Sequence, residues 1–594
     1  MPLTDVDPQV KARQSQAPLR LAVIGCGAVA QEVHLPVLAG HDGISLQALV
    51  DRNQKAAASL AAAYRVPVVA TDLGELDYKS IDAVLIATPP YHHAPCALEA
   101  IRHGLHVFVE KPMAVSLADA EATVKAAREA GVVLVVGVFR RLFSSTRMMQ
   151  ALLASGQFGQ PLQFDAEEGH IYDWSCASLG SMRKDLAGGG VLSDTGAHTL
   201  DQVLSFFTGP AELLSYQDNA RSGIESDCVL RLRVYHQGKP VEGRVELSRT
   251  RQLRNTFRVE TDRGILEFAT KERGWVTFQP HDLRLVDPAH GQMRAYENQW
   301  SWTSLPEPCL GADIRAEFED WLTAIQTGQT PVLSGESVLP TVRITEECYR
   351  SAQPLEEPWA KSTLISPPVG ANQAHSNGTP AVPTTVRVAA PAGRMLVTGA
   401  SGFIGGRLVE LLESQPGLEL RALVHNPGSV SRLARLPVEM CLGDLRSRED
   451  LSRAVAGCDT VVHCAYGSSG TDRESWATTV DGTRNLVKAA RQAGVKRFVH
   501  LSTIAVYGLR GTGTLDETTP PHPEAEPYSQ AKTAAEKVVG QAAHEGLCAT
   551  ILRLANVYGP FSMPYAVRPV QHLREGLPVF VGRGETPSNT VFVD

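Results

Sequence analysis

Several features are missing from this 594-residue sequence, and each absence excludes a class of protein. No apolar run comes close to the ~20 residues that cross a bilayer, so we expect no membrane-spanning segment. The net charge of −8 argues against a general binder of nucleic acids or acidic membranes. The N-terminus also lacks the basic and then apolar build of a secretory signal. Together these absences favour a cytoplasmic protein.

Cysteine pairs and metal-ligand spacings are missing as well. The ten cysteines are scattered, and none forms a CxxC pair. Scattered cysteines without a secretory signal are typical of reducing cytoplasm rather than of a disulfide framework. His92 and His93 are adjacent, so their side chains diverge in a strand or a helix. We therefore expect no metal site.

The chain is too long for one hydrophobic core, since domains average about 150 residues. The segment 366–391 is rich in Pro, Ala and Thr, with no helical period and too many prolines for a central strand. A long surface loop within one domain is the alternative, but structureless loops of this length are uncommon in compact domains. We interpret residues 355–392 as a linker between two folded parts, and residues 1–17 as a disordered tail.

A glycine-rich loop opens the first part. The apolar run 19–24 predicts a strand, and GCGAVA follows it with the spacing GxGxxA. Glycines at these positions let backbone N–H groups approach a pyrophosphate at a helix N-terminus. A second apolar run ends at Asp51, where an acid holds a ribose 2′-hydroxyl and favours NAD. Arg52 follows and suits a 2′-phosphate instead, so NADP stays open. The predicted contacts in the loop itself are Gly25, Gly27, Ala28 and Val29.

Two further motifs of the first part carry candidate chemistry. HVFVEKP ends a predicted strand at Glu110 and Lys111. Ligands bind outside the carboxyl ends of parallel strands, so Lys111 is placed to reach a nicotinamide and its substrate. Asp194 and His198 stand four residues apart and share a face if the segment is helical. A carboxylate beside an imidazole can support general acid–base chemistry, although a capping Asp and a packed His are the alternative.

Over approximately residues 18–353, the first part resembles the Gfo/Idh/MocA family of sugar and cyclitol oxidoreductases. The resemblance is carried, in the family's order, by GCGAVAQEVHLP, TPPYHHAPCALEAIRHGLHVFVEKPMA, VVGVFRRLF and GGGVLSDTGAHTLD. It implies that Lys111 hydrogen-bonds the reacting oxygen, that His198 exchanges its proton and that Asp194 orients His198. Phe139 stands where the family often has Asn, so a hydrogen bond to cofactor or substrate is not expected there. The implied cofactor contacts are Thr88, Pro89, His93, Glu110 and Lys111, and the implied substrate contacts are Arg140, Asp194 and His198.

After His198 the pattern changes to alternating apolar and polar residues, as in CVLRLRVY and VEGRVELSR. Such runs between polar or glycine turns predict an antiparallel sheet with one wet face. The resemblance implies that this is the family's second domain, whose open sheet commonly pairs subunits, so we expect a homo-oligomer. The expected boundaries are 18–138 for the nucleotide-binding domain and 139–354 for the second domain.

A different glycine loop opens the second part. MLVTGASGFIGG predicts strand, turn and helix with the spacing GxxGxxG, which gives the same close approach of backbone to phosphate. The next predicted strand ends without an acid, so NAD and NADP both stay open. The predicted cofactor contacts are Gly399, Ser401, Gly402, Phe403, Ile404, Gly405, Asp444, Leu445, Ala465, Tyr528 and Lys532.

Thr503, Tyr528 and Lys532 form a second acid–base set. Tyr528 and Lys532 stand one helical turn apart, so the ammonium can sit near the phenol and lower its pKa. Thr503 can hydrogen-bond the reacting oxygen of a substrate. A YxxxK pair alone often arises by chance, but here it follows GxxGxxG, GDL and STIAVYG in one stretch of chain.

These motifs resemble the extended short-chain dehydrogenase/reductase family, which includes sugar-nucleotide epimerases, dehydratases and reductases. The resemblance implies that Tyr528 is the acid–base, that Lys532 binds the ribose and depresses the Tyr528 pKa, and that Thr503 holds the substrate hydroxyl. The sequence stops at NTVFVD, where the family usually continues. We therefore expect residues 393–594 to form a Rossmann domain that lacks part of its substrate lid.

The expected fold class is α/β, with two Rossmann-type doubly wound parallel sheets, the first followed by an α+β domain with an open, largely antiparallel sheet. The expected function is a bifunctional oxidoreductase of sugars, cyclitols or sugar nucleotides, with one NAD or NADP per Rossmann module. The first module is expected to transfer hydride at a carbinol or ketone, and the second to reduce, epimerise or dehydrate. The alternative is one working dehydrogenase fused to a non-catalytic NAD(P)-binding sensor or partner-binding module.

Overall fold

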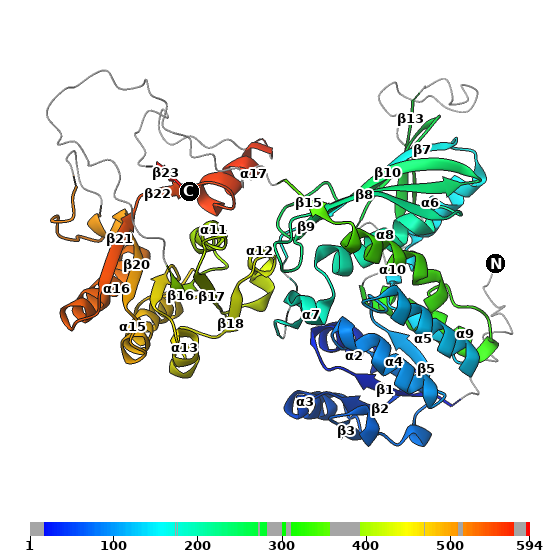
Figure 1. Ribbon diagram of the computed structural model, residues 1–594. Coiled ribbons are helices and arrows are strands. Elements are labelled where there is room, and N and C mark those ends of the chain that lie inside the picture. The colour runs from blue at the N-terminus through cyan, green and yellow to red at the C-terminus, as the bar shows by residue number, and fades with distance from the viewer. Residues whose placement is uncertain are drawn as a thin grey trace, which may run out of the picture. The chain divides into compact units, whose positions relative to one another are not determined.

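The computed structural model describes residues 17–172, 174, 176, 178–270, 274–281, 300–303, 310–356, 392–468, 470–508, 515–574, 576 and 590–593. The chain divides into two compact units, Met1–Leu355 and Glu356–Asp594 (Figure 1). The predicted tail, apart from Ala17, lies outside the described residues. So does the predicted linker, apart from Leu355, Glu356 and Ala392.

The first sheet has six parallel strands in the order β3-β2-β1-β4-β5-β6. Its central strands β1 and β4 are almost entirely buried, which is why their sequences are nearly continuous apolar runs. The strand order reverses direction between β1 and β4, so the loops after these two strands flank the usual ligand crevice. The strands are β1 (Leu19–Ile24), β2 (Ile44–Val50), β3 (Val68–Ala70), β4 (Ala83–Ile86), β5 (His106–Val109) and β6 (Leu134–Val136).

The α-helices of the first unit are α2 (Leu35–Leu38), α3 (Gln54–Tyr64), α4 (His93–Arg102), α5 (Leu117–Ala130), α6 (Ser144–Ser155), α7 (Lys184–Ala187), α8 (Val191–Ser205), α9 (Leu310–Thr327) and α10 (Gly335–Arg350). The last two, α9 and α10, return to this sheet from the end of the unit. Phe318 and Trp321 of α9 are fully buried in the same core as β1 and β4. α10 packs against both α5 and α8 (Figure 1). It therefore joins the nucleotide-binding sheet to the rest of the unit.

The second sheet has nine strands in the order β14-β13-β12-β11-β7-β10-β9-β8-β15. All neighbouring strands are antiparallel except the pairs β7–β10 and β8–β15. Alternate residues of β9 and β11 are buried, as one wet face requires. The strands are β7 (Pro161–Gly169), β8 (Ala211–Asp218), β9 (Asp227–His236), β10 (Lys239–Ser248), β11 (Thr256–Thr261), β12 (Gly264–Ala269), β13 (Trp275–Pro280), β14 (Trp300–Thr303) and β15 (Gln353–Pro354).

The second unit repeats the parallel design with its own sheet, in the order β18-β17-β16-β19-β20-β21. These strands are β16 (Gly393–Thr398), β17 (Leu418–Val424), β18 (Glu439–Leu442), β19 (Thr460–His463), β20 (Arg497–Thr503) and β21 (Ala549–Leu554), and β22 (Asn556–Tyr558) pairs with β23 (Thr590–Phe592). The helices are α11 (Phe403–Leu412), α12 (Ser431–Ala434), α13 (Arg448–Val455), α14 (Asp472–Trp476), α15 (Gly482–Gln492), α16 (Pro527–His544) and α17 (Arg568–Arg574).

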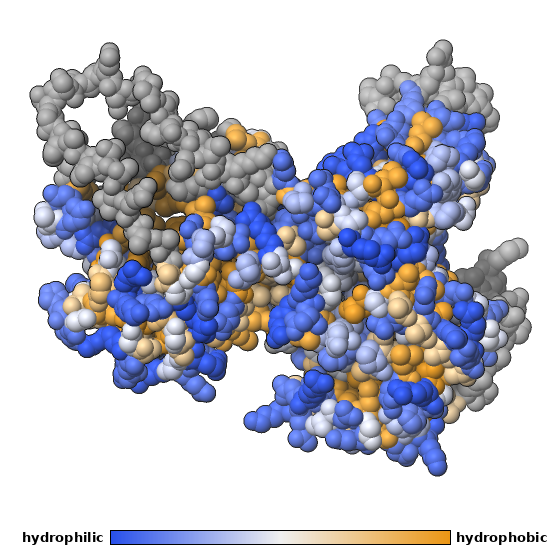
Figure 2. Space-filling view, in the orientation of Figure 1, coloured by the Kyte–Doolittle hydropathy of each residue, from blue (hydrophilic) through white to orange (hydrophobic). Residues whose placement is uncertain are grey.

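The fold class predicted from the sequence is confirmed: two parallel Rossmann-like sheets, and a mixed, largely antiparallel sheet after the first of them. Figure 2 shows hydrophilic residues interspersed with smaller hydrophobic patches over the visible face of each unit. Among the residues described above, no helix combines the length and the apolar character needed to span a membrane.

Candidate active sites

The first glycine loop is shaped for close backbone approach. Gly25 has φ +95°, and a Cβ there would lie 2.5 Å from the Ala87 carbonyl oxygen just after β4. A Cβ on Gly27 would meet open space, which is the gap that a phosphate needs. The Asp51 carboxylate accepts from the backbone N–H of Cys26 and of Asn53, both at 2.7 Å, and ties the loop to the end of β2. The loop therefore fits a dinucleotide, with Ala28 and Val29 partly exposed on its rim and Arg52 exposed beside Asp51.

His93, a predicted cofactor contact, also joins two loops. It is buried, and its Nδ1 and Nε2 lie 2.7 Å from the carbonyl oxygens of Pro112 and Thr88 respectively. Its ring thus ties the loop after β4, which includes Thr88 and Pro89, to the loop after β5. Because both nitrogens face backbone oxygens, His93 holds these two loops together, and its contact with a cofactor stays a prediction.

Glu110 likewise holds the Lys111 loop in place, through hydrogen bonds. One carboxylate oxygen lies 2.6 Å from Nε2 of His34, and the other accepts the backbone N–H of Lys111 at 3.0 Å. Burial alone would raise the pKa of Glu110, but hydrogen bonding to His34 and the nearby charges hold it below its ordinary value. The carboxylate is therefore ionised and fixes the backbone from which Lys111 projects.

Lys111, Asp194 and Arg249 form a partly buried chain of alternating charge. The Lys111 ammonium donates to a carboxylate oxygen of Asp194 and, at 3.2 Å, to the Asp194 carbonyl oxygen. Nη2 of Arg249 donates to the other carboxylate oxygen at 2.6 Å. Burial would raise the pKa of Asp194, but these two cations hold it well below its ordinary value. Asp194 is thus an anion shared between two cations.

Arg249 was missed by the sequence reasoning. It follows β10, its side chain is only 3% exposed, and its guanidinium carbon lies 4.8 Å from the centroid of the Tyr172 ring. Its Nε is buried without a partner among the described residues. The only sequence signal is an arginine at the end of an alternating run that contains other arginines, so no motif distinguishes it.

His198 is not paired with Asp194, which corrects the predicted role of Asp194 as its orienting group. Both Asp194 oxygens are taken by cations, and Nδ1 of His198 is buried without a partner among the described residues. The His198 ring lies edge to face with Phe139, with 5.0 Å between the ring centroids. Burial, and then the charges of Lys111 and Arg140, lower the pKa of His198 well below its ordinary value. The imidazole is therefore neutral.

Arg140 stands in the short helix η6 (Phe139–Leu142) and is held by a carboxylate. Its guanidinium makes two hydrogen bonds to Glu168 of β7, at 2.6 and 2.9 Å. The hydroxyl of Thr199 donates to the same carboxylate at 2.6 Å. Burial would raise the pKa of Glu168, but Arg140 outweighs it and holds the pKa below the ordinary value. This bidentate pairing fixes the direction of Arg140, whose contact with substrate stays a prediction.

The second glycine loop is also too tight for side chains. Gly399 has φ +68°, and a Cβ there would lie 2.7 Å from the backbone nitrogen of Ala465. A Cβ on Gly405 would lie 2.3 Å from the Gly399 carbonyl oxygen, so the first turn of α11 rests directly on the loop. Gly402 is the N-cap of α11. The predicted contacts Ser401, Phe403 and Ile404 therefore surround a helix N-terminus that fits a phosphate.

Asp444 and Leu445 lie in the loop after β18. The Asp444 carboxylate accepts from the side chain of Arg446 at 2.6 Å and from its backbone N–H at 2.8 Å. Leu445 is buried, and a Cβ on Gly482 would lie 2.9 Å from its Cβ. His425, which ends the strand without an acid, is exposed, with Nδ1 3.8 Å from Asp444.

Tyr528 and Lys532 lie in the first turns of α16, beside Thr503 at the end of β20. The buried Lys532 amine donates to the Leu501 carbonyl oxygen at 2.9 Å, and burial lowers its pKa to about 8. Burial raises the pKa of Tyr528, although hydrogen bonding to Thr503 opposes the shift. The predicted lowering of the Tyr528 pKa is therefore wrong in direction, because burial outweighs the favourable contacts. The Tyr466 ring lies 5.6 Å from the Tyr528 ring and 5.4 Å from Nζ of Lys532.

Three family models match the chain. The model described as "Oxidoreductase family, NAD-binding Rossmann fold" matches residues 19–138, and "GFO/IDH/MocA C-terminal domain" matches residues 146–267. The model described as "NAD dependent epimerase/dehydratase family" matches residues 395–585. The matches follow the order in which the two glycine loops appear along the chain.

Individual proteins are similar to parts of it. The 3-beta-hydroxysteroid dehydrogenase of Mycolicibacterium neoaurum is 36% identical over 179 residues, which are 28% of this chain and 48% of that protein. The dTDP-glucose 4,6-dehydratase of Streptomyces niveus is 33% identical over 195 residues, 30% of this chain and 57% of that protein. The crystal structure of KijD10, a 3-ketoreductase from Actinomadura kijaniata, in complex with NADP and TDP-benzene, is 20% identical, has a TM-score of 0.49 and covers 58% of this chain and 100% of its own.

The chain spans about half the length of the curated relatives that it matches. Both of its glycine loops fit a dinucleotide, and each of them lies within a matched nucleotide-binding model. The chain therefore carries two NAD(P)-binding units, the first with domains of the Gfo/Idh/MocA oxidoreductase family and the second with a domain of the NAD-dependent epimerase/dehydratase family.

Proposed function

We propose that this chain is a bifunctional nicotinamide-dependent oxidoreductase, with one NAD or NADP per unit. The observation that carries the proposal is that each unit has its own glycine loop and its own set of proton-exchanging side chains. A bound nicotinamide supplies the hydride acceptor or donor. The chain's own residues then need to hold the reacting oxygen and to move one proton.

In the first unit, the proposed substrate is a sugar, cyclitol or sugar nucleotide that reacts at a carbinol or ketone. Lys111 hydrogen-bonds the reacting oxygen, and Asp194 fixes the position of its ammonium. His198 is a neutral imidazole, so it can accept the hydroxyl proton when the carbinol is oxidised. Arg140, oriented by Glu168, is proposed to contact the substrate's polar groups.

In the second unit, Tyr528 exchanges the proton with the reacting oxygen and Thr503 holds that oxygen. Lys532 is proposed to bind the cofactor ribose. Dehydration needs a further acid and base beside the redox centre. Oxidation or reduction of a hydroxyl or ketone needs only Tyr528, Thr503 and the cofactor, so we favour it among the three reactions expected from the sequence.

A specific observation favours a second candidate substrate for this unit. Tyr466 is 45% exposed and makes an edge-to-face contact with the Tyr528 ring, which is itself 37% exposed. Aromatic faces around the acid–base suit an apolar ring better than a polyhydroxylated one. One relative is named for a 3-beta-hydroxysteroid. An apolar ring alcohol is accordingly the second candidate substrate.

Separate variants of the two units test the proposal. Lys111→Ala and Tyr528→Phe are screened with sugars, inositols, sugar nucleotides and hydroxysteroids, each with NAD and NADP. We expect each variant to lose one set of activities by roughly 10²–10⁴-fold and to keep the other. Lys125→Ala and Tyr558→Phe, at exposed positions of the same units, serve as matched controls. If Tyr528→Phe keeps every activity while still binding cofactor, the second unit is the non-catalytic sensor of the alternative.

We also propose that the chain acts in the cytoplasm as a homo-oligomer. The mixed sheet supports the second point, since the face that carries Arg231, Arg244 and Arg258 is open. Size-exclusion chromatography with light scattering is the test, and a monomer at micromolar concentration contradicts it.

A further inference from the structure

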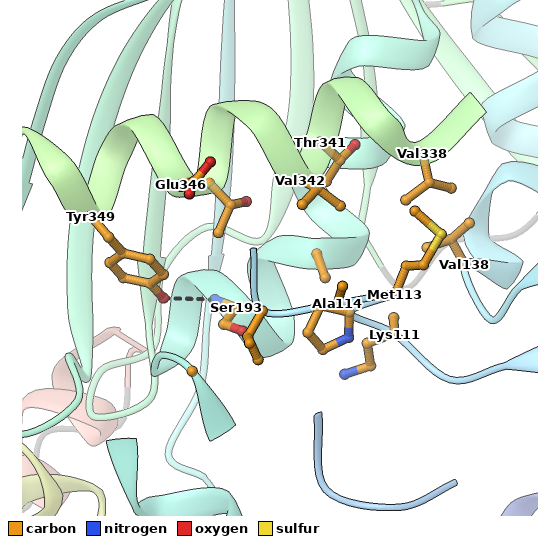
Figure 3. A pocket seen from close by; sticks show the side chains of 15 residues that line it. Lys111, Met113, Ala114, Val138, Ser193, Val338, Thr341, Val342, Glu346 and Tyr349 are labelled. Atoms are coloured by element: carbon orange, nitrogen blue, oxygen red, sulfur yellow. Dashed lines mark hydrogen bonds between the residues drawn. The ribbon is translucent and has the colours of Figure 1, made fainter. Parts of the chain in front are cut away.

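A cavity of about 180 Å³ lies behind the Lys111 loop, between that loop and α10 (Figure 3). The loop contributes residues 111–115 to one wall, and α10 contributes the facing wall. Met113, Val138 and Val342 are among the lining side chains, and each is at least 94% buried, since none exceeds 6% exposure. The cavity is thus largely enclosed by apolar side chains.

Two of the polar groups in its wall, the hydroxyls of Tyr349 and Thr341, are already hydrogen-bonded elsewhere. The Tyr349 hydroxyl donates to Glu225 at 2.8 Å and accepts the backbone N–H of Ser193 at 3.1 Å, the bond drawn in Figure 3. The Thr341 hydroxyl donates to Asp201 at 3.2 Å. A water molecule needs two to four polar partners to occupy a buried site. The wall offers few free ones, so an apolar occupant is favoured over water.

The cavity shares its walls with the candidate active site. Lys111 lies in the wall, and its amine nitrogen points away from α10 in Figure 3. Ser193 and Ala197 also line the cavity, and each directly precedes a residue of the site, Asp194 and His198 respectively. An occupant therefore presses on the backbone that presents all three candidate groups.

We propose that this cavity binds a small uncharged apolar molecule of about the size of benzene and that binding shifts the Lys111 loop. The size follows from the volume, since an engineered apolar cavity of ~150 Å³ binds benzene. The absence of charge follows from the lining: Lys111 is paired with Asp194 on the far side, and Glu346 lies within 3.5 Å of Arg350. Val115, which is 38% exposed, marks the mouth.

Thermal unfolding of the full chain with benzene as the probe tests the binding. We expect near-saturating benzene to raise Tm by about 2–4 °C in the wild type. Val342→Phe fills the cavity and is expected to remove this rise, whereas Val332→Phe, the same change at a position that is 48% exposed, keeps it. No rise in the wild type, or an equal rise in Val342→Phe, overturns the proposal.

The ε-methyl NMR signal of Met113 gives a second readout, which does not depend on the cavity-filling variant Val342→Phe. Met113 points into the cavity (Figure 3), so a benzene ring bound there shifts its methyl resonance. The signal is assigned by its disappearance in Met113→Leu. Saturable movement of this signal, with the other methionine signals unmoved, supports the proposal, and an unmoved Met113 signal overturns it. Neither readout requires activity, so the result is independent of the proposed function.

Discussion

The two candidate active sites hold their functional groups by different physical means. In the first, Lys111 is fixed by a partly buried anion, Asp194, which is itself fixed by the buried Arg249. In the second, Lys532 donates to a backbone carbonyl oxygen and lies over the ring of Tyr466. The first site is therefore a network of paired charges, whereas in the second the Lys532 amine is bonded to a neutral carbonyl oxygen, and the Glu536 carboxylate that acts on it is paired with Arg553.

The groups around Lys532 show how this difference affects the pKa values in the second site. Burial lowers the pKa of His500 to about 3, and the charge of Lys532 adds to that shift. His463, between the hydroxyls of Thr398 and Thr483, also has its pKa lowered well below the ordinary value by burial. These neutral histidines do not stabilise an ammonium, so the protonation of Lys532 is poised near pH 8. In the first site, by contrast, the pairing keeps Asp194 ionised.

Arg249→Ala removes one of the two cations that hold Asp194 in the first site, and it has the largest expected effect. Arg249→Ala leaves Asp194, whose side chain is 35% exposed, still paired with Lys111, so the free energy of unfolding is expected to fall by less than the about 3–5 kcal/mol that an unpaired, fully buried charge costs. We expect the activity assigned to the first unit to fall by at least about 100-fold, mainly in kcat, and Arg249→Lys to recover part of it. Urea unfolding and steady-state kinetics measure both effects.

Arg233→Ala is the matched control for that experiment. Arg233 lies in β9 of the same sheet, but its pairs with Glu212 and Glu242 are at the surface. Surface pairs contribute about 0–1 kcal/mol, so this variant is expected to behave nearly as the wild type. Equal effects of the two substitutions would show that Asp194 does not depend on Arg249.

The pH dependence of the free energy of unfolding tests the second site of this comparison, through Lys532. The pKa of Lys532 is lowered from 10.5 to about 8 in the folded state, so between these values the unfolded chain binds more protons. The free energy of unfolding of the second unit therefore rises with pH across this window, by at most about 3 kcal/mol. Lys532→Met is expected to remove this rise, and Lys537→Met, at an exposed position of the same helix, to keep it. An unchanged slope in Lys532→Met contradicts the assigned burial penalty.

Phe139→Asn is expected to have the smallest effect. It removes the edge-to-face contact with His198, which contributes about 0.5–1.5 kcal/mol. It also admits water beside the imidazole, so the pKa of His198 is expected to move up toward its ordinary value. An NMR titration of His198 between pH 5 and 8 measures this. The wild-type signal should stay neutral throughout, and a His198 that titrates in the wild type would contradict the burial argument.

Much of this structure could be predicted from patterns of a few consecutive residues. The glycine loops were predictable because the spacing of small residues after a strand is a property of a few consecutive positions, as at Gly25 and Gly399. The mixed sheet was predictable because alternation reports burial on one face, as in β9. The local pattern also placed Tyr528 and Lys532 one helical turn apart on α16 and Thr503 at the end of β20.

The partners of these residues were not predictable in the same way. Arg249 reaches Asp194 across 55 positions of sequence, and nothing local marks it among the other arginines of the sheet. His93 was expected to contact a cofactor because of the family resemblance, but only the packed loops show that both of its nitrogens face carbonyl oxygens. The direction of the Tyr528 pKa shift depends on burial, which a YxxxK spacing does not report.

The sequence by itself determined the architecture: two glycine loops of different spacing, each followed by its own acid–base residues, and an alternating region after the first. These are short-range patterns that the backbone geometry of strands and helices requires. The tertiary structure decided how each acid–base group is charged, because the charge state depends on burial and on partners brought from distant segments. Asp194 remains an anion between two cations, His198 is neutral beside Phe139, and Lys532 is poised near pH 8 for that reason.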